Sequence, residues 1–137
     1  MEFKKLVFIC ISIMFTNSCF AYEFKRASEN TLFKNYALSM CIATNYESES
    51  IYKDAIDSLN GNREYGNIAL EAYHELNEVQ KMWQKIKYKS KKGNVSELFM
   101  CIDFHNSKDV QNIFNRYNPC KDKANWNSDD EFKMRCK

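Results

Sequence analysis

Residues 95–117 read V-S-E-L-F-M-C-I-D-F-H-N-S-K-D-V-Q-N-I-F-N-R-Y, and the rest of the expected fold can be arranged around them. Apolar residues in the first half recur at i, i+3, i+4 and i+7, which predicts a helix with one stripe facing a core. Asn106 or Ser107 then begins a second helix, with Asp109 in its first turn, where the helix dipole favours an anion. The expected inward residues are Leu98, Cys101, Ile102 and His105 in the first helix and Val110, Ile113, Phe114 and Tyr117 in the second.

Two further helices are expected near the start of the mature chain. The first spans residues 28–46. The second begins at Ser48 or Ser50 and stops at Asn60-Gly61-Asn62, where turn-forming residues follow one another. Their expected inward residues are Phe33, Tyr36, Ala37, Met40, Cys41 and Thr44 in the first and Ile51, Ala55 and Leu59 in the second.

A third helix, expected to be the longest, begins at Glu64 or Asn67 and ends at residue 89. Its apolar residues alternate at spacings of three and four, close to a heptad seam. The neighbour that covers this seam could belong to the same chain or to a second copy. We favour the same chain, because a small bundle needs such a stripe. The seam consists of Ala69, Ala72, Leu76, Val79, Trp83 and Ile86.

Residues 1–21 are typical of a secretory signal peptide. Lysines at positions 4 and 5 give a charged start, residues 6–15 form an apolar core too short to span a bilayer, and residues 19–21 fit a small-x-small cleavage site. Acylation of Cys19, as in a lipoprotein, is a second interpretation, but the leucine expected at Thr16 is missing. We therefore favour soluble export, which leaves a single domain over residues 22–137.

The charge balance excludes one class of partner. The chain has 20 basic and 18 acidic side chains, and cleavage removes Lys4, Lys5 and Glu2, which leaves 18 and 17 and a net charge of +1. A nucleic-acid-binding protein needs a larger surplus of positive charge. Beyond the signal peptide no apolar run approaches membrane-spanning length. We expect neither nucleic acid nor, after cleavage, a membrane as partner.

Four cysteines remain after cleavage: Cys41, Cys101, Cys120 and Cys136. An even number in an exported chain is typical of disulfides, although three pairings are possible. We favour Cys41 with Cys101, because both lie on apolar helical stripes, and Cys120 with Cys136, which brackets the C-terminal tail. In the chain-entropy model these bridges contribute ~4 and ~3 kcal/mol, which is comparable with the stability of a whole small domain.

The end of the third expected helix is rich in lysine. One interpretation is a solvated helix end whose cations suit the negative pole of the dipole, with Gly93 as C-cap and Asn94 with Glu97 beginning the next helix. The other is a basic protruding loop that docks on an acidic surface. Both interpretations stay open for Lys85, Lys87, Lys89, Lys91 and Lys92.

The tail after Asn118-Pro119 is polar and is closed by the expected Cys120–Cys136 bridge. Ser128 can cap a short helix that runs through Arg135, because three acidic residues follow it. The sequence as a whole predicts an all-α fold, a small bundle of about four to five helices stapled by disulfides.

Cys101, Asp103 and His105 suggest a catalytic or metal site, but their geometry is poor. On a helix, positions 101 and 103 lie about 200° apart, so Asp103 faces away from Cys101. A disulfide at Cys101 would also remove the nucleophilic thiolate. His74 and His105 are the only histidines, and neither a C-x-x-C nor an H-x-x-x-H pair is present. We predict no enzyme, no metal site and no cofactor.

Several motifs together resemble the Tai4 family, the immunity proteins of type VI secretion amidase effectors. They are K-N-Y-A-L-S-M-C-I-A at 34–43, K-D-A at 53–55, E-A-Y at 71–73 and C-I-D-F-H-N-S-K-D-V at 101–110, and the last is the most specific. The resemblance covers residues 34–117. Asn106 before Ser107-Lys108 departs from the family pattern at a helix junction.

The resemblance implies a periplasmic, all-helical, non-enzymatic inhibitor of a Tae4-like amidase, a cysteine peptidase of the NlpC/P60 kind. It also implies a homodimer that forms a heterotetramer with the effector. A helix and a protruding inter-helix loop are then expected to occlude the amidase's active-site groove, which in this chain would be the exposed side of the third helix and one of its flanking loops. The alternative is a disulfide-stabilised periplasmic helical binding module of unrelated function. The effector-binding candidates lie in two loops at the ends of the third helix: Asn60, Asn62, Arg63 and Glu64 in one, and Lys87, Lys89, Lys91, Lys92 and Asn94 in the other.

Overall fold

The computed structural model describes residues 23–137, where the regular secondary structure is entirely helical. The expected signal peptide and the alternative acylation of Cys19 lie outside these residues. No helix in the described part of the chain combines the length and apolarity that crossing a bilayer requires. In chain order the elements are η1 (Glu23–Arg26), α2 (Glu29–Asn45), α3 (Glu49–Tyr65), α4 (Leu70–Trp83), α5 (Glu97–His105), α6 (Lys108–Tyr117), η2 (Pro119–Lys121), η3 (Lys123–Asn125) and α7 (Asp129–Arg135).

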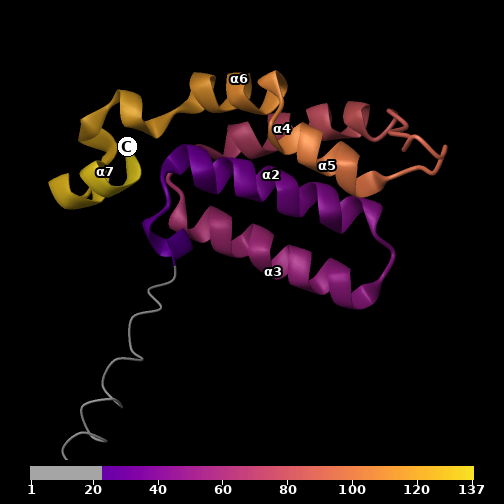
Figure 1. The fold of residues 1–137 in the computed structure, drawn as a ribbon. Helices are drawn as coiled ribbons and strands as arrows, with labels where there is room; N and C mark the ends of the chain where they lie inside the picture. Colours follow the sequence, from indigo (N-terminus) through magenta and orange to yellow (C-terminus); the bar gives the residue numbers. More distant parts are fainter. Residues whose placement is uncertain (1–22) are drawn as a thin grey trace, which may run out of the picture.

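Helix α2 runs through the middle of the molecule (Figure 1). Helix α3 packs along one side of it, and α4, α5 and α6 form a layer on the other side. The tail with α7 lies beside the N-terminal end of α2. The all-α bundle is therefore as predicted, and residues 23–137 contain five α-helices from α2 to α6 and a short sixth one in the tail.

Serine side chains cap three of the helices. The sequence predicts the cap at Ser128 and offers Ser107 or Asn106 at the start of α6, whereas the cap at Ser28 is found only in the structure. Ser28, Ser107 and Ser128 each accept a hydrogen bond from a backbone N–H three residues later, at 3.2, 3.2 and 3.1 Å. Such a cap satisfies one of the N–H groups that have no partner inside the helix. The same residue type also caps α5, because Ser96 accepts from the N–H of Phe99 at 3.3 Å. The expected signature of Asn94 with Glu97 was therefore wrong.

The core lies between α2 and the layer of α4, α5 and α6. The predicted inward faces of α2 and α6 are confirmed, except for Thr44, which is exposed and accepts a hydrogen bond from Gln80 at 2.7 Å. The heptad-like seam of α4 is used inside the chain: Ala72 and Leu76 are buried, and Val79 and Trp83 pack against the core. The fully buried residues, at 0% exposure, are Ala37, Cys41, Ala72, Leu76, Met100, Cys101, Phe104 and Val110.

Helix α3 does not stop at Asn60-Gly61-Asn62, as the sequence predicts, but continues to Tyr65. Asn62 is buried and donates from its side chain to the carbonyl of Ser58 at 2.8 Å, within the helix. A glycine inside a helix costs only about 0.5–1 kcal/mol, so packing of α3 on α2 outweighs the turn signal. With 17 residues, α3 is as long as α2 and longer than α4, which the sequence predicts to be the longest.

Helix α4 is shorter at both ends than expected. It ends at Trp83, whose ring lies 5.6 Å from that of Phe104 and whose indole N–H donates to Asp109 at 2.9 Å. These contacts fix Trp83 against α5 and α6, and the chain then turns away. Ala69 before α4 and Ile86 after it are exposed in consequence, although both are expected to face inward. Ile51, in the first turn of α3, is also exposed, contrary to the prediction.

The inward face of α5 differs from the predicted one. Met100, Cys101 and Phe104 are buried, whereas Leu98 and Ile102 are exposed. His105 is half-buried. Residues 98 to 102 are all apolar, so periodicity cannot fix the rotation of this helix about its axis. The disulfide at Cys101 and the contact of Phe104 with Trp83 fix it instead.

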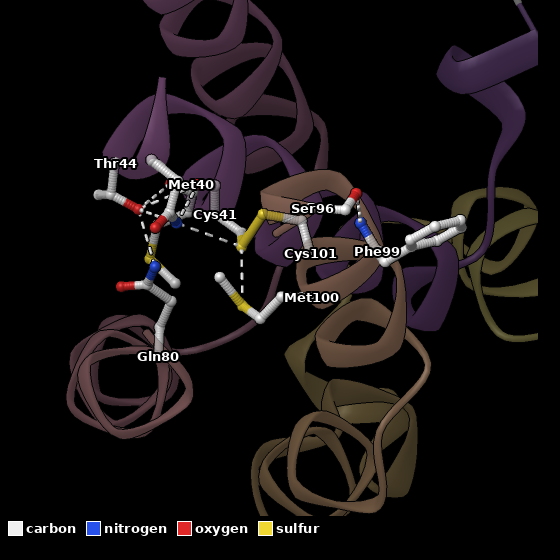
Figure 2. Close-up of a disulfide and its surroundings, with 9 residues drawn as sticks. Met40, Cys41, Thr44, Gln80, Ser96, Phe99, Met100 and Cys101 are labelled. Carbon is white, nitrogen blue, oxygen red and sulfur yellow. Dashed lines mark hydrogen bonds between the residues drawn. A yellow bond between two sulfur atoms is a disulfide. The ribbon is translucent and has the colours of Figure 1, made fainter. Parts of the chain in front are cut away.

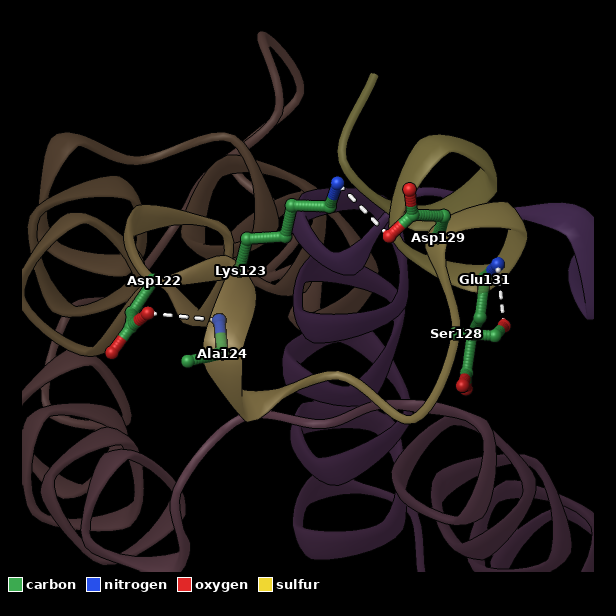
Figure 3. A network of polar contacts seen from close by, with 6 residues as sticks. All are labelled: Asp122, Lys123, Ala124, Ser128, Asp129 and Glu131. Atoms are coloured by element: carbon green, nitrogen blue, oxygen red, sulfur yellow. Dashed lines mark hydrogen bonds and ion pairs between the residues drawn. The ribbon is translucent and has the colours of Figure 1, made fainter.

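The tail folds back onto the start of α2 through Arg135. This side chain is buried, donates to the carbonyl of Ala27 at 2.9 Å and lies 5.9 Å from the centre of the Tyr65 ring. Local polar contacts shape the rest of the tail: Asp122 caps η3, and Lys123 forms an ion pair with Asp129 at 2.9 Å (Figure 3). The Cys120–Cys136 disulfide closes this segment, as predicted.

Candidate functional site

Residues 84–96, which we call the basic loop, extend beyond the ends of α4 and α5 (Figure 1). Their backbone forms a short hairpin: Lys89 and Val95 form an antiparallel bridge, and the N–H of Ser90 donates to the carbonyl of Asn94 at 2.8 Å. Gly93 lies in the turn with φ of +86°, a conformation that glycine adopts without strain. Gly93 therefore forms the turn of the hairpin. The interpretation of Gly93 as the C-cap of the third expected helix was wrong, because α4 ends at Trp83.

Positive charge covers this hairpin. Its five lysines, at positions 85, 87, 89, 91 and 92, are all exposed, and residues 84–96 include no carboxylate. Within the described chain the ion pairs involve other residues: Lys81 with Glu78, Arg116 with Glu75, and Lys123 with Asp129. The lysine charges are therefore free to interact with a partner.

The base of the basic loop is held firmly although its tip is exposed. The carbonyl of Tyr88 accepts from the N–H of Ser96 at 2.9 Å, and the Tyr88 ring packs against the core. Partial burial, and then the hydrogen bond and negative charge of Asp103, raise the pKa of the Tyr88 phenol. The loop is thus joined to α5 on one side and to the core below. Such an arrangement presents the lysines in a limited range of positions, which lowers the entropy lost on binding.

The second group of candidates, Asn60, Asn62, Arg63 and Glu64, lies in the last turns of α3 and not in a loop. Asn62 is buried, and Arg63 and Glu64 are exposed. Helix α4 separates this group from the basic loop by about 20 Å, because a helix rises ~1.5 Å per residue. The structure therefore does not bring the two groups together, and only the basic loop protrudes.

Cys101 has no free thiol (Figure 2). Its sulfur is bonded to that of Cys41 at 2.07 Å, both residues are 0% exposed, and the Met100 sulfur lies 3.7 Å from that of Cys41. Asp103 is exposed, on a different side of the helix. A sealed disulfide cannot act as a nucleophile, so these residues form no thiol-based catalytic site.

Histidines and carboxylates do not form a metal site in the described part of the chain, where no cluster of three possible ligands occurs. His74 is exposed on α4. His105 is half-buried at the end of α5, where burial and the charge of Lys34 lower its pKa while a hydrogen bond with Asn106 opposes them. Its surroundings are those of a histidine at a helix end. Without a thiol or metal site among the described residues, the exposed lysines of the basic loop suit recognition of a partner by surface shape and charge.

Known proteins place the chain in a family. The model of the Tai4 family, type VI secretion system amidase immunity proteins, matches residues 31–114. The chain belongs to the Tai4 family. Members are immunity proteins, so this chain is an inhibitor and not an enzyme. The match ends before the tail with Cys120 and Cys136.

Solved structures agree with this membership. A chain in the Tae4/Tai4 effector–immunity system of Salmonella typhimurium is 31% identical, with a TM-score of 0.60, and the match covers 65% of this chain and 88% of that one. Two further complexes are 23% identical with TM-scores of 0.60 and share the fold. One is Tae4–Tai4 from Enterobacter cloacae, covering 63% of this chain and 88% of that one, and the other is Salmonella typhimurium Tae4 with Enterobacter cloacae Tai4, covering 63% and 89%. Among curated proteins none matches.

The Tai4 membership agrees with the family resemblance of the sequence motifs. Two features of the surface were not found from the sequence. One is the hairpin form of the basic loop, because lysine-rich segments without apolar alternation carry no strand signal. The other is the apolar outer face of α5, where Leu98 and Ile102 are exposed although the sequence predicts them to be buried.

Proposed function

We propose that this protein is exported to the periplasm, binds a Tae4-like amidase there and occludes its active-site groove with the basic loop. The family and the related structures of Tae4/Tai4 effector–immunity systems support a Tae4 amidase as the partner. The observation that carries the proposal is the protrusion of a firmly based hairpin whose five lysines form no ion pair within residues 23–137. Inhibition then depends on complementarity of surfaces and requires no reactive group.

Two features support the periplasm as the site of action. The sequence begins with a segment typical of a signal peptide, and the described chain has two disulfides. Disulfides persist in oxidising compartments such as the bacterial periplasm. An inhibitor must also meet an enzyme that cuts peptidoglycan where the substrate lies. Detection of the mature chain, beginning at Tyr22, in a periplasmic extract would test this part of the proposal.

A homodimer that binds two amidases is part of the same proposal. The seam of α4 is covered within the chain, so a dimer would use a different surface. Light scattering of the mature chain alone and with amidase gives both stoichiometries. A monomer at micromolar concentration would remove the dimer from the proposal without affecting amidase binding.

Charge reversal in the basic loop tests occlusion. Replacing Lys89, Lys91 and Lys92 with Glu leaves the core untouched and should slow association with an amidase that has an acidic groove, most strongly at low salt. A matched control replaces Lys53, Lys133 and Lys137, which are also exposed, with Glu and should bind as the wild type does. Equal binding by both triple variants and the wild type would exclude the basic loop as the inhibitory element.

The other group of candidates provides the alternative outcome. Reversal of charge at Arg63 and Glu64, with Asn60→Ala, should leave affinity unchanged if the basic loop enters the groove. Loss of affinity in this variant alone would assign inhibition to the C-terminal end of α3. Failure of the wild-type protein to bind any Tae4-like amidase would leave the alternative, a periplasmic binding module of unrelated function.

A further inference from the structure

The outer face of α5 is apolar, and nothing in the described chain covers it. Leu98, Phe99 and Ile102 are 46%, 58% and 41% exposed, and Val95, just before the helix, is 49% exposed. We call these four residues the apolar strip. Single exposed apolar side chains are ordinary, but contiguous ones mark surfaces that bind a partner.

The strip faces away from the core. A helix turns about 100° per residue, so Ile102 and Phe99 lie about 40° and 100° from Leu98, and the buried Met100, Cys101 and Phe104 occupy the opposite side. The Phe99 ring points away from the buried disulfide (Figure 2). Rotation of α5 to bury the strip is prevented by the bond from Cys101 to Cys41.

The apolar strip continues directly into the basic loop. Val95 forms the antiparallel bridge with Lys89, and Leu98 and Phe99 lie in the first turn of α5. The two features therefore form one surface, with an aromatic and aliphatic part beside a part that bears five lysines. Protein interfaces commonly have this form, with an apolar centre that excludes water and a charged rim.

The charges indicate what covers the strip. Face-to-face contact between two copies of this surface would bring two sets of five lysines together without a carboxylate in either loop, which is unfavourable. An anionic lipid surface suits the lysines but not Asp103, which is exposed on α5 beside the strip. A protein groove with apolar walls and an acidic rim suits both parts.

We propose that Val95, Leu98, Phe99 and Ile102 form the apolar anchor of the complex with the amidase. In this arrangement Phe99 and Ile102 enter an apolar part of the groove, and the basic loop lies against its acidic rim. The proposal rests on the proposed function and adds that the outer face of α5, and not the loop alone, determines how long the complex lasts.

Truncation of the strip gives the test. Phe99→Ala and Ile102→Ala should each raise the dissociation rate of the complex, by roughly 10-fold or more for Phe99, as is usual for a central aromatic residue at an interface. The effect should depend little on salt, in contrast to that of the lysine variants. The matched control is Leu70→Ala, because Leu70 is 57% exposed at the far end of α4. Circular dichroism should show that all three variants stay folded with melting temperatures close to that of the wild type.

Four results distinguish a failure of the apolar anchor from a failure of the proposed function. Dissociation rates of both strip variants equal to that of the wild type would overturn the anchor while the proposed function stands. No binding of amidase by the wild type would overturn the proposed function, and with it the assignment of the strip. A dimer that becomes a monomer in Phe99→Ala, with unchanged amidase affinity, would make the strip a self-association surface. Sedimentation of the wild type, but not of Phe99→Ala, with phosphatidylglycerol vesicles would make it a lipid-binding surface.

Discussion

The two faces of α5 have similar residues and opposite surroundings. The inner face presents Met100, Cys101 and Phe104 to the core, all at 0% exposure. The outer face presents Leu98, Phe99 and Ile102 to solvent. Apolar residues on the inner face hold the fold together, whereas those on the outer face are available to a partner. Variants of one helix can therefore separate stability from binding.

The largest effect is expected from the inner face. Phe104→Ala should lower the free energy of unfolding by about 3–5 kcal/mol, because it leaves a cavity among fully buried residues. The matched change on the outer face, Phe99→Ala, should alter it by less than about 0.5 kcal/mol. Urea denaturation monitored by circular dichroism gives both values. If Phe104→Ala does not fold, Phe104→Leu makes the same comparison with a smaller cavity, and equal losses for Phe99 and Phe104 would contradict the difference between the faces.

The disulfide on the inner face should have the next largest effect. Replacing Cys41 and Cys101 with Ala removes a link across 60 residues, for which the chain-entropy model gives about 4 kcal/mol. The bond also fixes the rotation of α5, so amidase binding should weaken together with stability. Full stability in this double variant would show that packing alone holds the inner face in place.

The features predicted correctly from the sequence are those that short-range chemistry determines. Serine caps begin α6 and α7, because a hydroxyl three residues before a free N–H is a local signal. The pairing of Cys41 with Cys101 followed from two inward stripes in an exported chain. The lysines of the basic loop were recognised as a candidate surface by their charge alone.

The features missed depend on tertiary contacts. The rotation of α5 about its axis is fixed by the contact of Phe104 with Trp83 and by the disulfide of Cys101. Because the sequence of this helix is apolar on most sides, its periodicity does not indicate which side faces these partners. Helix α3 passes through Gly61 because Asn62 bonds within the helix and packs against its neighbour. For the same reason the apolar strip could not be predicted: Leu98 and Ile102 were expected to face the core.

The second disulfide lies away from both faces of α5 and gives a sharper control. Replacing Cys120 and Cys136 with Ala removes a link across 16 residues, worth at most about 3 kcal/mol in the chain-entropy model. The loss should loosen the tail and the contact of Arg135 with Ala27, and amide hydrogen exchange should rise in residues 118–137. Amidase affinity should stay unchanged. A loss of affinity in this variant, with α5 still protected from exchange, would make the tail part of the binding surface.

The smallest effect concerns His105, at the end of α5 between the two faces. Burial, and the charge of Lys34 on α2, lower its pKa, although a hydrogen bond with Asn106 acts in the opposite direction. The unfolded state then binds more protons than the folded state, so stability should fall as the pH falls below 6.5. His105→Gln should reduce this loss between pH 7.5 and 5.5, measured by urea denaturation.

The buried Glu29 makes stability change with pH in the opposite direction, because burial raises the pKa of its carboxyl above 4.5. Glu29 is present in both the wild type and His105→Gln, so its contribution cancels when their stabilities are subtracted. The matched variant His74→Gln, at an exposed histidine, should keep the wild-type dependence on pH. An unchanged dependence in His105→Gln would show that protonation of this residue does not affect folding.

The central claim is that the basic loop and the outer face of α5 together meet the amidase. Hydrogen–deuterium exchange of the mature chain, alone and in complex with a Tae4-like amidase, tests it most directly. We predict slower exchange in residues 84–102 of the complex and no change in residues 60–65. Slower exchange in residues 60–65, with none in residues 84–102, would contradict the account.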